Sequence, residues 1–194
     1  EMLYAAIFLG ERTLAVSDQE DLPDETPALR AKPPLSAVNI MQGCDNFCSY
    51  CIIPYTRGRI RSKPMELALA EITALTANGY QEIVLTGIHL DSYGKETGKF
   101  DLCDLLEQTN KIKNLKRLRL GSLEPVFITD ENIGRLQNVK ALCPQFHLSL
   151  QSGSDETLQR MNRHYTTAQY TKAVERIKKA FPDAAITTDI IVGF

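Results

Sequence analysis

The chain has 194 residues, of which 43% are hydrophobic and 24% are charged, and its formal net charge is −2. This balance is that of a globular domain with a sizeable core, and it excludes a disordered chain. No apolar run approaches the roughly 20 residues that a membrane helix needs, so we expect no membrane-spanning segment and no membrane partner.

Residues 1–35 are predicted to be a linker. Residues 1–25 carry seven acidic residues and one basic residue, whereas the rest of the chain carries 17 and 21. The acidity peaks at "SDQEDLPDETP" (17–27), whose polar residues and prolines are typical of a solvated segment. Before it, "MLYAAIFLG" (2–10) is read as a strand or linker, with a signal peptide as the alternative. Because the chain starts at Glu1, we expect a missing N-terminal domain ahead of this linker.

Strands and helices are predicted to alternate over residues 36–194. Five runs read as strands, at 36–41, 82–88, 117–123, 146–152 and 184–194. Five stretches read as helices, at 64–78, 101–112, 129–139, 154–162 and 167–181. This alternation is typical of βαβ units and a parallel sheet, so the predicted fold class is α/β. An open doubly wound sheet and a partial (β/α) barrel both fit, and in either the ligands bind at the carboxyl ends of the strands. Because no helix follows the last strand, we expect the domain to be incomplete at its C-terminal end.

Local signals mark the ends of several of these helices. Pro64 stands where a helix can begin, and Gly79 is placed to end the same helix. Asp101 and Ser154 are predicted to be N-caps. Gly134 lies inside the helix expected over 129–139 and weakens it.

Three of the five cysteines lie within eight residues, in the pattern Cys44-x3-Cys48-x2-Cys51. An odd number of cysteines with three clustered argues against disulfides and favours thiolates that hold a metal in a reducing compartment. A structural zinc ion wants four ligands. Cys103 or Cys143 could supply the fourth, but both are isolated in the sequence, which favours small core side chains. A [4Fe–4S] cluster held by three cysteines keeps one iron open for a substrate or a cofactor.

The cysteine pattern, with Tyr50 directly before its last member, resembles that of the radical S-adenosylmethionine superfamily. The resemblance implies a partial (β/α) barrel with a [4Fe–4S] cluster on Cys44, Cys48 and Cys51. It also implies S-adenosylmethionine on the open iron, bound through its amino and carboxylate groups, with Tyr50 in the cofactor site. An electron donor to the cluster is implied as well, since reduction cleaves a carbon–sulfur bond and releases a 5′-deoxyadenosyl radical.

Longer segments resemble one branch of that superfamily, the methylthiotransferases. They are "QGCDNFCSYCIIPYTRGRIRSKP", "LTGIHLDSYG", "RLRLGSLEP", "FHLSLQSGSDETLQRMNRHYT" and "ITTDIIVGF", and they span most of residues 36–194. "TGIHL", "GSLEP" and "FHLSLQSG" are most similar to enzymes that modify threonylcarbamoyladenosine next to the anticodon of tRNA. A related branch acts on isopentenyladenosine in tRNA and usually has "GQNV" where this chain has "TGIHL" (86–90). A third branch modifies a ribosomal protein.

The resemblance implies an enzyme, a transferase that inserts sulfur at a C–H bond of the modified adenine and then methylates it. One S-adenosylmethionine would supply the radical and another the methyl group. Members also carry a second [4Fe–4S] cluster in an N-terminal domain and a small C-terminal RNA-binding domain, and neither has a counterpart here. We therefore expect the central catalytic domain alone, in the cytoplasm, able to cleave S-adenosylmethionine but unable to complete methylthiolation.

Residues near the ends of the strands are candidates for binding the cofactor. Thr86 and Gly87 end the second strand, where the superfamily binds the methionine amino group through backbone carbonyls, and a glycine permits a close approach. Arg163 is a candidate for holding the cofactor carboxylate through charge-assisted hydrogen bonds. The alternatives are a plain strand-to-loop turn at Thr86 and a solvent-facing arginine at a helix end.

The third and fourth strands also end in polar residues. Ser122 and Glu124 end the third strand, and Gln151 ends the fourth. Their side chains are expected to face the cofactor or the substrate, because the carboxyl ends of parallel strands meet at one edge. The alternative for Glu124, which precedes Pro125, is a solvated turn.

Two groups of basic residues stand out. The first directly follows the cysteines and is predicted to contact RNA, because a cationic rim suits a polyanion; it comprises Arg57, Arg59, Arg61 and Lys63. The second is read as ordinary surface charge and comprises Lys111, Lys113, Lys116, Arg117 and Arg119.

A different class of function remains open, a zinc-stabilised nucleic-acid-binding module without chemistry. A protein purified without oxygen that is brown and holds about four irons would favour the enzyme, and a colourless zinc protein would favour the module. The histidines are read as packing or hydrogen-bonding residues and not as metal ligands; they are His89, His147 and His164.

Overall fold

The computed structural model describes residues 6–10, 12 and 32–194. Residues 6–8 are helical, which differs from the strand or linker expected over 2–10. Most of the predicted linker over 1–35, including its acidic part at 17–27, lies outside the described residues.

The described strands form two sheets with the orders β2-β1-β3-β4 and β5-β6-β7. Neighbouring strands are parallel except for β1 and β2, which are antiparallel. The strands are β1 (Leu35–Gln42), β2 (Arg61–Ser62), β3 (Glu82–Gly87), β4 (Arg117–Leu120), β5 (Ser122–Leu123), β6 (Gln145–Leu148) and β7 (Ala185–Thr187).

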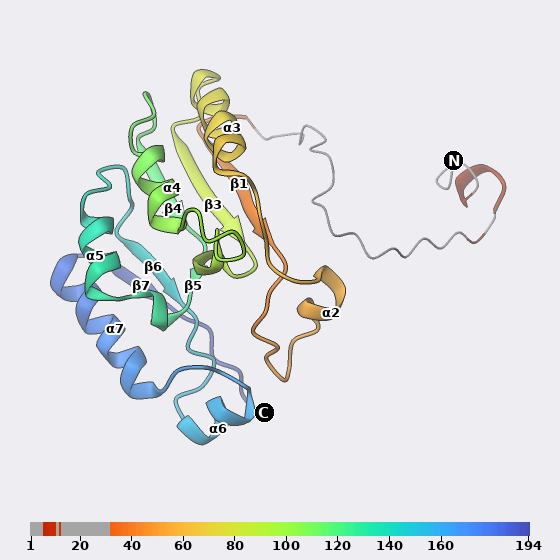
Figure 1. Ribbon diagram of the computed structural model, residues 1–194, viewed down its shortest axis with the longest axis vertical. Coiled ribbons are helices and arrows are strands. Elements are labelled where there is room, and N and C mark those ends of the chain that lie inside the picture. Colours follow the sequence, from red (N-terminus) through yellow and green to blue (C-terminus); the bar gives the residue numbers. More distant parts are fainter. Residues whose placement is uncertain (1–5, 11, 13–31) are drawn as a thin grey trace.

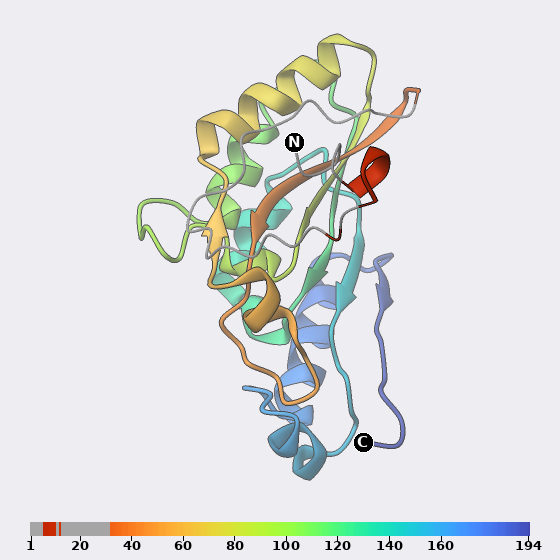
Figure 2. The same cartoon turned by 90° about the vertical axis from the view of Figure 1, so that its right-hand side faces the viewer.

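Four helices form one layer on a single side of the sheets, in the order α3, α4, α5 and α7, each in contact with the next (Figure 1). Figure 2 shows the strands from the side that this layer leaves uncovered. The described helices are α2 (Ile53–Arg57), α3 (Met65–Ala77), α4 (Leu102–Thr109), α5 (Asp130–Gln137), α6 (Asp155–Arg160) and α7 (Thr167–Ala180), with 3-10 turns at Leu90–Ser92 and Pro125–Phe127.

This arrangement is a partial (β/α) barrel, as expected. Parallel strands follow one another across the sheets in chain order, and the helices between them lie on one side. A doubly wound sheet would carry helices on both faces, so that alternative is excluded. The carboxyl ends of the parallel strands meet at one edge, and the loop that carries the three cysteines starts from that edge at the end of β1.

One-sided cover explains how the strands are buried. In β1, Val38 and Ile40 are fully buried against the helices, while the alternating residues Ala37 and Asn39 are exposed. In β3, Ile83 and Leu85 are buried and their neighbours are half-buried. Successive side chains of a strand point to opposite faces, so the uncovered face is available for a site.

The third predicted strand, over 117–123, is divided in two at Gly121. Its amide donates to the carbonyl of Leu85 at 2.9 Å, the last bond of this segment to β3. Ser122 already pairs with His147 of β6. A Cβ at position 121 would stand 3.3 Å from the Leu85 oxygen, so a glycine suits the point where the chain changes partner.

The helix ends follow the local signals. Asp101 accepts from the amide of Asp104 and completes a capping box, and Ser154 accepts from the amide of Thr157. Gly79, at φ +89°, follows the end of α3. The last predicted strand is shorter than expected, since only residues 185–187 pair continuously and Ile190 makes a single bridge to Gln151.

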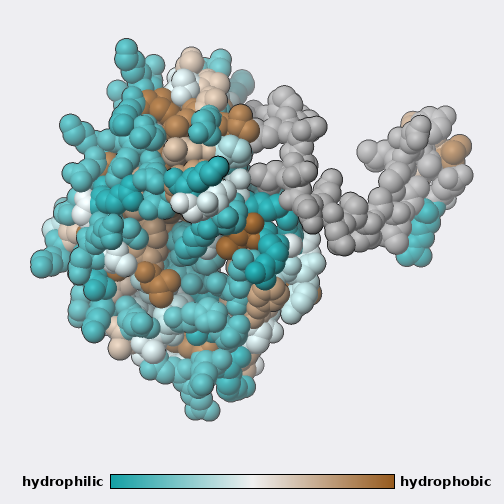
Figure 3. All heavy atoms as spheres, viewed as in Figure 1, coloured by the Kyte–Doolittle hydropathy of each residue, from teal (hydrophilic) through white to brown (hydrophobic). Residues whose placement is uncertain are grey.

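No described helix is both long and apolar enough to cross a membrane. Figure 3 shows hydrophobic residues as scattered patches among hydrophilic ones on one face of the molecule.

Candidate iron–sulfur and cofactor site

The three clustered cysteines lie on the cysteine loop, which we define as residues 43–52, between β1 and α2 (Figure 1). Cys48 is buried, Cys44 and Cys51 are half-buried, and none of the three forms a disulfide. The amide of Cys51 donates to the carbonyl of Cys48 at 2.9 Å, which turns the chain between the last two thiols.

Cys103 and Cys143 are buried elsewhere, as their isolation in the sequence predicts. Cys103 lies on α4 in the hydrophobic core, and Cys143 precedes β6. Burial raises the pKa of both thiols, which favours the neutral form of a core residue.

Gly43 closes the base of the cysteine loop. Its φ is +74°, and a Cβ there would stand 1.9 Å from the carbonyl oxygen of Arg59. The same approach lets the amide of Cys44 donate to the carbonyl of Gly58 at 3.2 Å. A glycine is therefore required at position 43, both for the positive φ and for the close approach of the segment that contains Gly58 and Arg59.

Replacing Gly43 with alanine is expected to open the loop and prevent cluster assembly. A matched control is Gly98→Ala, because Gly98 also has a positive φ, +63°, but has no atom within 4 Å of an added Cβ. The control carries only the left-handed strain of about 1–2 kcal/mol. In urea unfolding, Gly43→Ala should lose at least about 2 kcal/mol more unfolding free energy than Gly98→Ala does, because the backbone at Arg59 must also move. Equal losses, with iron content unchanged, would contradict this account of Gly43.

The end of α6 anchors the cysteine loop from the far side of the barrel. The side-chain amide of Asn162 donates to the carbonyls of Asn46 and Phe47, both at 3.0 Å. The amide of Ser49 donates to the carbonyl of Met161 at 3.1 Å. Segments more than 110 residues apart are thereby joined, and no local pattern in the sequence indicates this contact.

Arg163 reaches the cysteine loop directly. Its Nη1 donates to the sulfur of Cys48 at 3.1 Å, and its Nη2 lies 2.7 Å from Oε1 of Glu124. Both charged side chains are buried, so neither the solvent-facing arginine nor the solvated turn considered for these residues is correct. The side chain of Asn46 donates to the same Glu124 oxygen at 2.7 Å. The third strand end, the cysteine loop and the α6 segment thus share one buried ion pair.

His89 adds a second positive charge beside Glu124. Its Nε2 lies 3.3 Å from Oδ1 of Asp91 and 3.7 Å from Oε2 of Glu124, and its Nδ1 is hydrogen-bonded to Ser92 at 2.6 Å. Burial by itself lowers the pKa of His89, but Asp91, Cys44 and Glu124 raise it to about 11. Although burial opposes it, the contacts with His89 and Arg163 hold the pKa of Glu124 below its usual value.

Thr86 and Gly87 lie where predicted, at the carboxyl end of β3 beside β1. The hydroxyl of Thr86 donates to the carbonyl of Val38 at 3.3 Å. A Cβ on Gly87 would stand 2.6 Å from Cγ of Met41, so the close approach that this glycine permits within the protein is that of a methionine side chain.

Ser122 and Gln151 lie at the same edge of the barrel. Ser122 is exposed in β5. Gln151 has a φ of +65°, and its amide donates to the carbonyl of Asp189 at 3.0 Å. Tyr50 lies beside Cys48, and burial raises the pKa of its hydroxyl well above the ordinary value, so the phenol stays neutral.

The first basic group divides into two parts. Arg57 and Arg59 are exposed, and Arg61 donates from Nη2 to the carbonyl of Arg57 at 3.0 Å. Lys63 is buried and its ammonium lies 2.6 Å from a carboxylate oxygen of Glu71. The prediction that Lys63 contacts RNA is therefore wrong, because the side chain is inside the protein and its charge is already paired.

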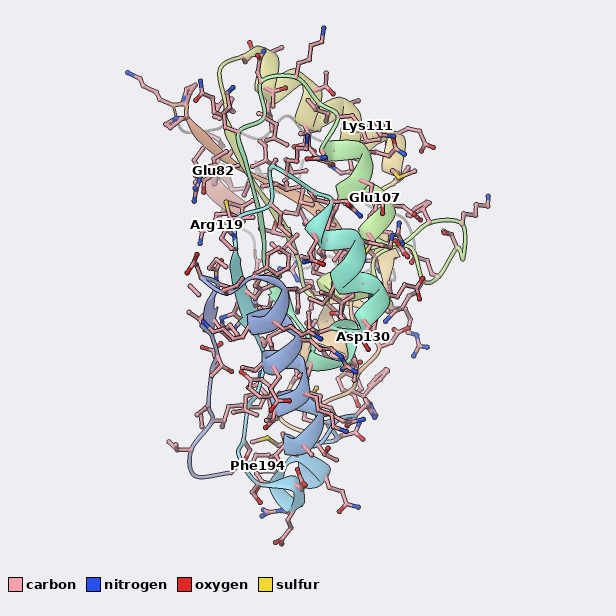
Figure 4. The ribbon with its side chains drawn as sticks, turned by 90° about the vertical axis from the view of Figure 1, so that its left-hand side faces the viewer. Glu82, Glu107, Lys111, Arg119, Asp130 and Phe194 are labelled. Atoms are coloured by element: carbon pink, nitrogen blue, oxygen red, sulfur yellow. The ribbon has the colours of Figure 1, made fainter. Side chains whose placement is uncertain are left out.

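The second basic group lies at the other end of the strands, where β4 begins. Arg117 and Arg119 lie 2.9 and 3.6 Å from Glu82, at the start of β3. Figure 4 shows Glu82, Arg119 and Lys111 toward one end of the molecule and Phe194, whose ring packs on Tyr50 of the cysteine loop, toward the other. This placement agrees with the reading of the second group as ordinary surface charge.

Comparison with known proteins adds independent findings. The model of the radical SAM superfamily matches residues 38–194. The tRNA-2-methylthio-N(6)-dimethylallyladenosine synthase of Caldicellulosiruptor saccharolyticus is 43% identical over 196 residues, which cover 100% of this chain and 42% of the relative. The synthase of the same name from Clostridium botulinum (strain Loch Maree) is 45% identical over 183 residues, 93% of this chain and 41% of the relative. The chain thus spans about two fifths of the length of these relatives.

Solved structures share the fold at low sequence identity. The cobalamin-dependent S-adenosylmethionine radical enzyme OxsB matches with a TM-score of 0.60 and 16% identity, over 80% of this chain and 23% of that one. The radical S-adenosylmethionine methyltransferase TsrM from Kitasatospora setae matches with a TM-score of 0.60 and 18% identity, over 80% and 30%. These likenesses concern the fold alone. Because the family model covers the barrel from β1 onward, the chain belongs to the radical SAM superfamily.

Proposed function

We propose that this chain is the catalytic domain of a tRNA methylthiotransferase that acts on dimethylallyladenosine, the isopentenyl-modified base. The observation that carries the proposal is the identity of 43–45% to synthases of that name across 93–100% of the chain. The matched segment includes the cysteine loop and the buried Glu124–Arg163 pair. The partners are then tRNA, S-adenosylmethionine and an electron donor, in a reducing cytoplasm.

The donor set fits a [4Fe–4S] cluster on Cys44, Cys48 and Cys51. Thiolates are the ligands of such clusters, and three of them leave one iron open. Arg163 donates a hydrogen bond to the sulfur of Cys48, and the side chain of His89 lies beside Cys44, so each of these two sulfurs has a polar neighbour from outside the cysteine loop. When bound, the cluster supplies the electron that cleaves S-adenosylmethionine.

The remaining strand-end residues are proposed to contact the cofactor. Thr86 and Gly87 offer backbone carbonyls at the end of β3, and Ser122 and Gln151 lie at the same edge. Tyr50 offers a neutral phenol next to Cys48. A second [4Fe–4S] cluster, in an N-terminal domain ahead of residues 1–35, is part of the same proposal.

Threonylcarbamoyladenosine is the second candidate substrate. It has less support than dimethylallyladenosine, because the relatives described above are named for the latter. The segments "TGIHL" and "GSLEP", which resemble the enzymes for threonylcarbamoyladenosine, supply His89 and Glu124. The structure brings these two side chains within 3.7 Å of each other. The zinc-stabilised binding module is not proposed, because the chain belongs to a family of radical enzymes.

Mass spectrometry of tRNA nucleosides from a strain that lacks the gene tests this proposal. We expect dimethylallyladenosine to accumulate without its methylthio group, and the full-length gene to restore the modification. A gene that encodes Cys48→Ala should fail to restore it. Accumulation of threonylcarbamoyladenosine that lacks the methylthio group would select the second candidate. An unchanged nucleoside profile would overturn the assignment to tRNA.

A further inference from the structure

An exposed aromatic surface lies directly beside the cysteine loop. Tyr55, in the short helix α2, is 73% exposed, and Ile52, next to Cys51, is 65% exposed. Large apolar side chains with this exposure mark an interaction site when they are grouped and flanked by charge. Sequence patterns did not single them out, because a helix of five residues has no readable period.

Three side chains hold this surface in one arrangement. The ring of Tyr55 packs edge-on against Phe47, with centroids 5.7 Å apart and planes at 80°. The guanidinium of Arg59 lies over the same Phe47 ring, 5.6 Å from its centroid, and its Nε lies 3.1 Å from Asp45. Phe47 therefore fixes an exposed phenol and an exposed guanidinium around a single ring, an arrangement that we call the aromatic–arginine platform (Phe47, Tyr55 and Arg59).

The platform is built on the cysteine loop itself. Phe47 stands between Cys44 and Cys48, and its carbonyl accepts the hydrogen bond from Asn162 that anchors the loop. A ligand on the platform would therefore be held at a defined position relative to the three thiols. The platform is not a part of the buried Glu124–Arg163 site, since its outward groups are exposed to solvent.

The charge of the surface indicates the kind of ligand. The side chain of Arg59 is 72% exposed although it is paired with Asp45, and Arg57 is exposed in the last turn of α2. An exposed aromatic ring next to guanidinium groups suits a single-stranded nucleic acid, because a base can stack on the ring and the guanidinium groups can neutralise phosphates. Proteins that read RNA loops use unstacked bases in this manner.

We propose that the aromatic–arginine platform stacks one unpaired base of an RNA loop on Tyr55, and that Arg59 and the neighbouring Arg57 attract the adjacent phosphates. This inference rests on the proposed function, since it presumes an RNA substrate, and it adds the residues and the mode of contact. It assigns different roles to neighbouring side chains, stacking to Tyr55 and electrostatic attraction to the two arginines.

The test uses the full-length protein with its iron–sulfur clusters and two fluorescent RNAs, an anticodon stem-loop and a fully paired duplex with the same number of nucleotides. Binding is measured by anisotropy over a range of salt concentrations. We expect Tyr55→Ala to weaken binding of the stem-loop roughly 5- to 150-fold, which corresponds to the 1–3 kcal/mol of one stacked base. The slope of log K against log salt should stay unchanged, because no charge is lost. Tyr55→Phe should bind as the wild type does.

Two comparison variants separate stacking from the other contributions. Leu67→Ala removes an apolar side chain that is 54% exposed on α3, and it should leave binding unchanged. The double variant Arg57→Gln/Arg59→Gln should weaken both RNAs and reduce the salt slope by roughly 1 to 2. Thermal unfolding of each variant confirms that it is folded.

The outcomes distinguish this inference from the function on which it rests. If the wild type binds the stem-loop and Tyr55→Ala binds it as Leu67→Ala does, the platform is not a stacking site, and a protein segment would be its better occupant. If Tyr55→Ala weakens both RNAs equally, stacking of an unpaired base is also refuted. If the wild type binds neither RNA, the proposed function itself fails.

Discussion

Replacing any one of Cys44, Cys48 and Cys51 with alanine is expected to abolish assembly of the radical-generating cluster and all cleavage of S-adenosylmethionine. Three thiolates are the smallest set that holds such a cluster with one iron open, so no redundancy exists in the cysteine loop. The described cysteines outside the loop cannot substitute, because Cys103 and Cys143 are buried on other elements.

Iron and sulfide analysis of the reconstituted full-length protein measures this effect. Each variant should lose about four irons relative to the wild type, and 5′-deoxyadenosine should no longer form from S-adenosylmethionine. Cys103→Ala is the matched control, since it removes a thiol from the core and should keep both properties. Retained cleavage in any one of the three loop variants would refute the ligand assignment.

Replacing Glu124 with leucine is expected to lower the free energy of unfolding by about 3–5 kcal/mol, because it leaves the charge of Arg163 buried without its anion. It also removes one of the two carboxylates beside His89, which keeps Asp91. The side chain of Asn46 in the cysteine loop also loses its acceptor. We therefore expect this variant to hold the cluster poorly even when it folds.

Urea unfolding of the metal-free protein without oxygen measures this loss. The double variant Glu124→Leu/Arg163→Met should recover part of the stability, since apolar replacement of a whole buried pair is often tolerated. Asp130→Asn is the control, because Asp130 pairs with Arg176 at 2.9 Å while its side chain is 87% exposed, and exposed pairs contribute at most about 1 kcal/mol. Equal losses for Glu124→Leu and Asp130→Asn would contradict the role given to the buried pair.

The repeating elements of the fold could be predicted because their signals are local. Strand runs bounded by turn residues, together with the caps at Asp101 and Ser154, placed most elements of the barrel within a few residues, whereas the last strand ends at Thr187 and not at residue 194. The division at Gly121 could not be predicted, because it follows from a change of hydrogen-bonding partner between β3 and β6. The five-residue α2 and the two-residue β2 were missed, since elements this short have no period.

The candidate site was predicted in part. Cys44, Cys48 and Cys51 are proposed as ligands from their spacing alone, because three side chains on one loop need no long-range contact to be close. Glu124 and Arg163 were named as separate candidates with solvent-exposed alternatives, and only the structure shows that they form one buried pair. Lys63 was assigned to the RNA surface because the sequence shows its charge but not its burial against Glu71.

By itself the sequence determined the residue types and the spacing on which the proposed chemistry rests, since both are covalent properties of the chain. Cys44, Cys48 and Cys51 form the motif proposed to hold an iron–sulfur cluster, and the alternation of strands and helices predicted the barrel that carries it. The tertiary structure alone decided which distant residues reach that site. Asn162 anchors the loop, Arg163 contacts Cys48, and Phe47 aligns Tyr55 with Arg59. The physical reason is that hydrogen bonds and ion pairs act over a few ångströms in space, and folding sets that separation independently of distance along the chain.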